Sequence, residues 1–228
     1  LGKTTLAHAL ARQNKKILLF DGDLGLANVD VQLGLAPAVD LGGVLAGTYD
    51  LKADTSRYED GGFDVIAGRS GSGSLAALPT DRLRALGSQL TSLSQDYDSV
   101  LLDLGAGIDR TVRQLASLAS PILVVCTDEP TSLTDAYAFI KLTVAQNRNA
   151  DLRVVINMAG SKSEAERTYT TLRKACENFL KITPPLAGLV RRDSHVKQAI
   201  RAQSPLLQRF PNCDAAQDIE ALAKSLLS

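Results

Sequence analysis

The start of the chain contains residues that could bind a phosphate group. Gly2, Lys3, Thr4 and Thr5 end the pattern G-x-x-x-x-G-K-[ST], in which backbone N–H groups at the start of a helix surround phosphate oxygens. In this pattern Lys3 neutralises the β- and γ-phosphates, the Thr4 hydroxyl binds Mg²⁺, and Thr5 lies near the α-phosphate. A helix capped by threonines beside an ordinary lysine would have the same four residues, so other evidence is needed to distinguish the two.

A second stretch, "DSVLLDLGAG", places an acidic residue where a metal ligand is expected. It is an apolar strand that ends in Asp103 and is followed by glycines. The carboxyl ends of parallel strands meet at one edge of a sheet, and ligands bind there. We therefore expect Lys3, Asp21, Asp23 and Asp103 to lie at or beside that edge.

The acidic stretch "DGDLGLANVD", which begins at Asp21, has two interpretations. A calcium loop of the EF-hand type needs an oxygen ligand at position 5, glycine at position 6 and glutamate at position 12. Those positions are Gly25, Leu26 and Gln32, so the calcium interpretation fails. A structural role, in which Asp21 and Asp23 only cap a turn, stays open. It does not explain why unpaired carboxylates lie beside a phosphate loop, where they would repel an anion.

Short apolar runs alternate with segments of helical length, which is typical of a mostly parallel sheet. The predicted strands are 17–20, 63–67, 100–104, 122–126, 154–157 and 186–190. The predicted helices are 4–13, 79–94, 132–146, 163–180, 193–202 and 215–228. We predict an α/β fold, a doubly wound and mostly parallel sheet with helices on both faces, formed by one domain over residues 1–228.

The composition excludes several classes of protein. The 228 residues are 45% hydrophobic and 22% charged with no net charge, which is ordinary for a globular domain and gives no overall attraction to nucleic acid. No apolar run is long enough to span a bilayer. Cys126, Cys176 and Cys213 are far apart and form no C-x-x-C or Cys/His cluster in the sequence. We therefore expect reduced thiols in a cytoplasmic protein, without disulfides or a zinc site.

Several stretches together resemble the MinD/ParA family of deviant P-loop ATPases, and most of all its flagellar-number branch, the FlhG (FleN) proteins. They are "GKTT", "DGDLGLANVDVQLGL", "DSVLLDLGAG", "TDEPTSLTDAYAFIKL" and "GLVRRDSHVKQAIRAQSPL". The resemblance implies an enzyme that binds ATP/ADP with Mg²⁺, hydrolyses ATP and forms an ATP-dependent homodimer. It also implies partners such as a flagellar GTPase or a flagellar transcription regulator.

The resemblance assigns roles to the residues of the phosphate loop and the acidic stretches. Lys3 and Thr4 would hold phosphate and Mg²⁺, and Asp21 would hold a Mg²⁺-bound water. Asp23 would orient the attacking water as the catalytic carboxylate. Asp103 would be the Walker B aspartate, so that the implied metal site consists of Thr4, Asp21 and Asp103.

Other assignments concern the nucleotide base and the switch. Asn157 matches the base-recognising asparagine of the family, and Asp193 lies in the late segment that runs near the adenine. Arg191 stands where that segment usually has proline, which puts the adenine contact there in doubt. Asn28 and Asp30 are interpreted as parts of the switch and of the helix that follows it.

Both ends of the sequence raise expectations. The family pattern begins K-G-G-x-G-K-T-T, whereas this chain starts at the x, Leu1. We expect a strand and the lysine that crosses the dimer to lie upstream.

The C-terminal segment bears on membrane association. Residues 215–228 contain one lysine and two acids, which favours a helix packed on its own domain over one lying on anionic lipid. Peripheral association with the inner membrane or the cell pole would then use a segment outside this sequence.

The sequence leaves alternative functions open. Division-site selection and DNA partition are functions of other branches of the family, although the neutral charge argues mildly against a protein that binds DNA directly. The scattered cysteines disfavour relatives that hold iron–sulfur clusters. A nucleotide-binding scaffold that does not hydrolyse ATP is the alternative from another class, and the presence of Lys3, Thr4, Asp23 and Asp103 argues against it.

Overall fold

The computed structural model describes residues 2–23, 29, 33–34, 43–44, 50–68 and 79–227. Within it the chain divides into two compact units. Unit 1 consists of Leu1–Leu118 and Ala199–Arg209, and unit 2 of Ala119–Gln198 and Phe210–Ser228. The expectations for Asn28 and Asp30 lie outside the described residues.

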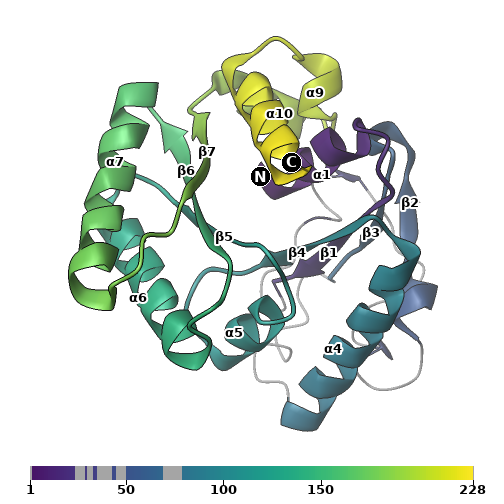
Figure 1. The fold of residues 1–228 in the computed structure, drawn as a ribbon. Helices are drawn as coiled ribbons and strands as arrows, with labels where there is room; N and C mark the ends of the chain where they lie inside the picture. Colours follow the sequence, from purple (N-terminus) through teal and green to yellow (C-terminus); the bar gives the residue numbers. More distant parts are fainter. Residues whose placement is uncertain are drawn as a thin grey trace. The chain divides into compact units, whose positions relative to one another are not determined.

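The sheet of unit 1 has four strands in the order β2-β3-β1-β4 (Figure 1). The strands are β1 (Ile17–Gly22), β2 (Ser56–Tyr58), β3 (Phe63–Ile66) and β4 (Ser99–Leu104). β1 runs parallel to β3 and β4, whereas β2 pairs with β3 in the antiparallel direction. Every residue of β1 is buried, as expected for a strand that is covered on both faces.

Helices cover both faces of this sheet. They are α1 (Gly2–Ala11), α4 (Thr80–Leu93), α5 (Arg110–Ala116) and α9 (Leu206–Arg209), with 3₁₀ turns at Leu51–Asp54, Glu59–Gly61 and Ser94–Asp96. Leu18 and Phe20 of β1 pack with leucines of α4 in one core cluster. Ile17 and Leu19 are equally buried on the opposite face, where α1 contacts β1.

Unit 2 contains a three-stranded parallel sheet in the order β5-β6-β7. Its strands are β5 (Ile122–Cys126), β6 (Leu152–Ala159) and β7 (Leu186–Arg191). Its helices are α6 (Pro130–Gln146), α7 (Lys162–Ala175) with a π-helical turn at Cys176–Leu180, α8 (Ser194–Arg201) and α10 (Asp214–Leu227). α6 and α7 share a core cluster with one face of the sheet, and α10 packs on β7 from the other face (Figure 1).

The predicted fold class is confirmed, because each apolar run predicted as a strand forms one and helices cover both faces of both sheets. Three elements were not predicted. β2 has three residues and follows no apolar run, and α5 and α9 are too short to show a helical period. The predicted helix 163–180 ends as an α-helix at Ala175 and continues as the π-helical turn.

The last helix, α10, uses its apolar residues inside unit 2. Its buried apolar side chains are Ala215, Ala216, Ile219, Leu222 and Ala223. Leu222 contacts Gly188 of β7 so closely that a Cβ on that glycine would lie 3.1 Å from Leu222 Cδ1. The expectation of a helix packed on its own domain is therefore confirmed. Among the described residues, no helix is long and apolar enough to span a bilayer.

Candidate functional site

Lys3 lies at the start of α1 and is bonded to the carboxyl end of β4. Its Nζ donates to the Asp103 carboxylate and, at 2.8 Å, to the backbone carbonyl of Leu104. The Lys3 side chain is 42% exposed and that of Asp103 is 13% exposed, so the pair lies at the surface of unit 1. Lys3 and Asp103, to which the resemblance assigns the phosphate-loop and Walker B positions, are in direct contact.

α1 begins at Gly2, and Lys3, Thr4 and Thr5 lie in its first turn. The first four N–H groups of an α-helix have no carbonyl partner within the helix, and they lie at the positive end of the helix dipole. A helix N-terminus of this kind can bind an anion.

Asp21 is buried at the end of β1, next to Asp103 in the register of the two strands. Its side chain accepts two backbone hydrogen bonds. Oδ1 accepts a hydrogen bond from the N–H of Asp23 at 3.3 Å, and Oδ2 accepts one from the N–H of Val29 at 3.1 Å. The turn-capping role that the sequence left open is therefore present, and any contact of Asp21 with a metal-bound water would be made in addition to it.

Asp23 follows the end of β1, and its carboxylate lies against the loop after β4. A Cβ added to Gly105 would be 3.0 Å from Asp23 Oδ1, closer than most side-chain contacts, so a larger residue there would push on the carboxylate. Gly107, two residues on, has a φ of 118°, which residues other than glycine rarely adopt. Gly105 therefore adjoins the predicted catalytic carboxylate.

The charges at this edge of the sheet fit a divalent cation. Asp21, Asp23 and Asp103 all lie at the carboxyl ends of β1 and β4, and Lys3 supplies one positive charge among them. Carboxylate, hydroxyl and water oxygens are the ligands that Mg²⁺ prefers. The donor set of Asp21, Asp103 and the Thr4 hydroxyl thus fits Mg²⁺ chemically.

The two residues assigned to the nucleotide base lie in unit 2, Asn157 within β6 and Asp193 after the neighbouring parallel strand β7. Asn157 lies near the end of β6, where the register with β7 shifts and the next residue, Met158, has a φ of 56°. Asn157 Oδ1 accepts a hydrogen bond from the N–H of Met158 at 2.9 Å, so the amide stabilises this irregular turn. β6 extends to Ala159, two residues beyond the predicted end of the strand.

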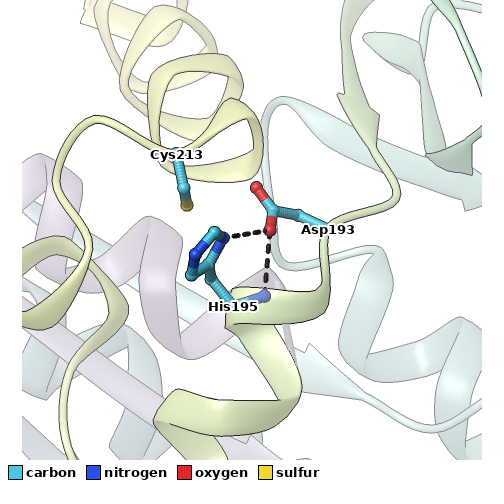
Figure 2. Close-up of side chains that lie close together, drawn as sticks. All are labelled: Asp193, His195 and Cys213. Atoms are coloured by element: carbon cyan, nitrogen blue, oxygen red, sulfur yellow. Dashed lines mark hydrogen bonds and ion pairs between the residues drawn. The ribbon is translucent and has the colours of Figure 1, made fainter.

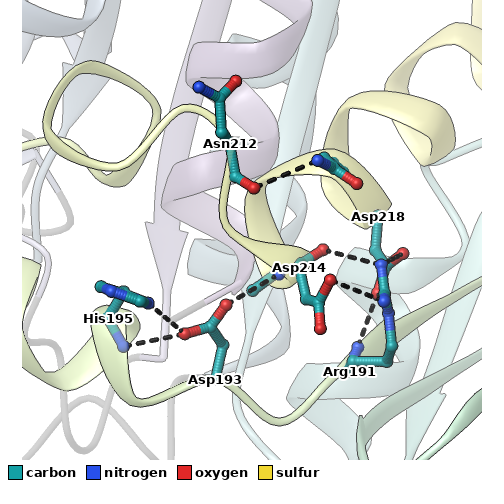
Figure 3. Close-up of polar contacts among 8 residues, drawn as sticks. Arg191, Asp193, His195, Asn212, Asp214 and Asp218 are labelled. Atoms are coloured by element: carbon teal, nitrogen blue, oxygen red, sulfur yellow. Dashed lines mark hydrogen bonds and ion pairs between the residues drawn. The ribbon is translucent and has the colours of Figure 1, made fainter.

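Asp193, which follows β7, joins the first turns of two helices (Figure 3). One carboxylate oxygen accepts the N–H of His195 in α8 at 2.9 Å, and the other accepts the N–H of Ala215 in α10 at 3.3 Å. Burial by itself would raise the pKa of Asp193, but hydrogen bonds from the backbone and ring of His195 and from Ala215 lower it to about 2. The ionised carboxylate therefore organises the loop that the sequence assigned to the adenine region.

Arg191 has a structural role in place of the proline usual at its position in the family (Figure 3). Its Nε and Nη2 donate to both carboxylate oxygens of Asp218 at 2.8 Å, and its Nη1 lies 2.7 Å from Asp214. The Asp218 side chain is only 8% exposed. The arginine thus fixes the end of β7 to α10.

Replacing Arg191 with leucine is expected to lower the free energy of unfolding by about 2 kcal/mol, because the buried Asp218 carboxylate would lose its charged partner. Urea denaturation followed by circular dichroism measures this change. The matched control is Arg192→Leu, which removes the same charge from the exposed neighbouring residue and should change the free energy by less than about 0.5 kcal/mol. Equal effects of the two substitutions would contradict this role of Arg191.

Cys213 has neighbours that the sequence spacing did not indicate. It lies near Asp193 and His195, and one potential ligand atom from each of the three residues is within 4.8 Å of the other two (Figure 2). The sequence spacing concealed this because 17 residues, including α9 and most of α8, separate His195 from Cys213. Cys126 and Cys176 are buried in the core of unit 2.

Comparison with known proteins gives matches over nearly the whole chain. The family model described as cellulose biosynthesis protein BcsQ matches residues 2–227. The antiactivator FleN of Pseudomonas aeruginosa is 34% identical over 230 residues, which cover 99% of this chain and 82% of FleN. The flagellum site-determining protein YlxH of Helicobacter pylori is 30% identical over 228 residues, which cover 98% of this chain and 75% of YlxH.

Solved structures show the same fold. The septum site-determining protein MinD from Pyrococcus horikoshii, determined in complex with Mg-ADP, superimposes with a TM-score of 0.80 and 23% identity. The superposition covers 99% of this chain and 90% of that structure. Together with the match over residues 2–227 and the identity with FleN, this fold shows that the chain belongs to the MinD/ParA family of P-loop ATPases.

Proposed function

We propose that this chain is a Mg²⁺-dependent ATPase that dimerises when it binds ATP and controls the number and placement of flagella. The main support for the proposal is the contact of Lys3 with Asp103. At the same edge of the sheet, Asp21 lies beside Asp103 in the register of β1 and β4. The identity with FleN and with the flagellum site-determining protein YlxH supports the flagellar process. The MinD structure with Mg-ADP supports the nucleotide and the metal.

In the proposed mechanism Lys3 changes partners when ATP binds. Its ammonium group now neutralises Asp103 and is partly exposed, so it can turn to the oxygens of the β- and γ-phosphates. The N–H groups at the start of α1 bind the same phosphates. Thr4, Asp21 and Asp103 would hold Mg²⁺, which would supply charge stabilisation for the phosphates.

Asp23 would orient the attacking water. Its carboxylate accepts a hydrogen bond from that water and so aims the oxygen lone pair at the γ-phosphorus. The water oxygen would bond to the γ-phosphorus as the bond from that phosphorus to the bridging oxygen breaks. The water proton would pass to the phosphate that forms, and ADP and phosphate would leave. Because phosphoryl transfer depends mainly on positioning, the contact of the Asp23 carboxylate with Gly105 matters for the rate.

Asn157 and Asp193 would serve the nucleotide base. Asn157 would hydrogen-bond the base, and Asp193 would keep the loop after β7 in the required conformation through its bonds to α8 and α10. The proposed partners are a second copy of this chain and a flagellar GTPase or transcription regulator, with peripheral association at the inner membrane or cell pole.

Deleting the gene in its native host is expected to change the number or position of flagella, counted by electron microscopy, and to leave the division site in place. The wild-type gene should restore the count, whereas Asp23→Ala should not. Normal flagella with misplaced septa would instead assign the chain to division-site selection, and a defect in plasmid or chromosome inheritance would assign it to partition.

A further inference from the structure

Asp193, His195 and Cys213 form a compact group of nitrogen, oxygen and sulfur donors on unit 2. Asp193 follows β7, His195 lies in the first turn of α8, and Cys213 directly precedes α10. One potential ligand atom from each residue lies within 4.8 Å of the other two, and Figure 2 shows the three side chains converging. Among the described residues, no other group of three such side chains comes this close.

The imidazole of His195 is held in a defined position. Its Nδ1 lies 2.8 Å from the Asp193 carboxylate, and its ring packs on Phe210 with 4.6 Å between the ring centroids. The side chain remains 43% exposed, so an ion can reach the group from solvent. The carboxylate and the aromatic ring together restrict the orientation of this partly exposed imidazole.

Cys213 lies beside the first turn of α10 and next to Asp193. It directly precedes Asp214, the first residue of α10. Its sulfur is within 4.8 Å of a ligand atom of Asp193 and of one of His195, and the residue is only partly buried. A metal ion between the sulfur and the carboxylate would take the place of the thiol proton.

We propose that Asp193, His195 and Cys213 bind a divalent transition-metal ion, for which Zn²⁺ is the best match. Sulfur, imidazole nitrogen and carboxylate oxygen are the ligands of tetrahedral zinc sites, and a water completes the fourth position. Mg²⁺ prefers oxygen ligands, which separates this site from the one at Asp21 and Asp103. Bound Zn²⁺ ties the loop after β7 to the start of α10.

The test uses the full-length chain, stripped of metal and kept in excess Mg²⁺ so that the oxygen sites are occupied. Zn²⁺ is titrated by calorimetry, and Co²⁺ is added separately because a cobalt–thiolate bond absorbs in the near ultraviolet. The expected result is one Zn²⁺ per chain and a cobalt–thiolate band. Cys213→Ser should abolish the band and weaken Zn²⁺ binding by about 100-fold or more, and His195→Gln should weaken binding by at least about tenfold.

Two controls distinguish the site from other groups. Asp214→Asn removes a carboxylate next to Cys213 that bonds to Arg191 and not to the three proposed ligands, so Zn²⁺ binding should not change. Cys176→Ala removes a thiol buried elsewhere in unit 2, so the cobalt band should remain. Circular dichroism of each variant verifies that it is folded.

The absence of both Zn²⁺ binding and the cobalt band in the wild type would overturn the proposal. So would binding that neither Cys213→Ser nor His195→Gln weakens. If Cys213→Ser does not fold, the partly exposed His195→Gln still decides the matter. Zn²⁺ binding is measured without nucleotide, so this result is independent of whether the chain hydrolyses ATP.

Discussion

Replacing Asp23 with alanine is expected to lower the rate of ATP hydrolysis by about 10²–10⁴-fold, the usual contribution of a side chain that positions a proton-transferring group. The carboxylate would no longer orient the attacking water, whereas Lys3, Thr4 and Asp103 would still hold the phosphates and Mg²⁺. The affinity for Mg·ATP should therefore change little. Phosphate release under single-turnover conditions and equilibrium binding of a fluorescent ATP analogue measure the two quantities separately.

The same variant also tests the dimer. Because it binds ATP without consuming it, sedimentation in Mg·ATP should show a dimer, and a monomer at all accessible concentrations would contradict the proposed switch. Asp81→Asn in α4 is the matched control, since it removes an exposed carboxylate of the same unit and should leave the rate unchanged. If the wild type and Asp23→Ala are equally inactive even with the partner proteins, the chain is a nucleotide-binding scaffold and not an enzyme.

Most strands could be predicted because a strand that is buried on both faces has a continuous run of apolar residues in the sequence. β1 and β6 are apolar over most of their length, as strands covered on both faces must be. β2 has no such apolar run, because only one of its three side chains is buried. Its pairing with β3 decides its conformation. Its antiparallel direction likewise depends on the tight turn through Gly62, which has a φ of 68°.

The candidate site could be predicted only in part. Lys3, Asp21 and Asp103 follow from the rule that parallel strands present their carboxyl ends at one edge, and the structure brings them together there. The hydrogen bonds from the N–H groups of Asp23 and Val29 to Asp21 were not predictable, because no sequence pattern indicates which backbone groups a buried carboxylate will meet. The approach of Cys213 to His195 was likewise hidden, since it depends on how α8 and α10 both begin beside Asp193.

Replacing Lys3 with methionine is expected to weaken ATP binding by roughly 10²–10⁴-fold. Each hydrogen bond from the ammonium group to a phosphate contributes about 1.5–3 kcal/mol, and Lys3 is proposed to serve two phosphates. Methionine keeps most of the length of the side chain and removes only the charge and the donor. Lys15→Met makes the same change at an exposed position beyond the end of α1 and should leave the affinity unchanged.

The contact of Lys3 with Asp103 adds a second, opposite expectation for the same variant. In the absence of nucleotide the ammonium group neutralises the carboxylate, so Lys3 and Mg²⁺ compete for Asp103. Without the lysine, Asp103 loses this neighbouring positive charge, so the nucleotide-free chain should bind Mg²⁺ more tightly than the wild type does. Calorimetry with Mg²⁺ alone measures this effect. A general loss of structure would weaken both ligands, whereas the proposed exchange of partners requires that ATP affinity falls while Mg²⁺ affinity rises.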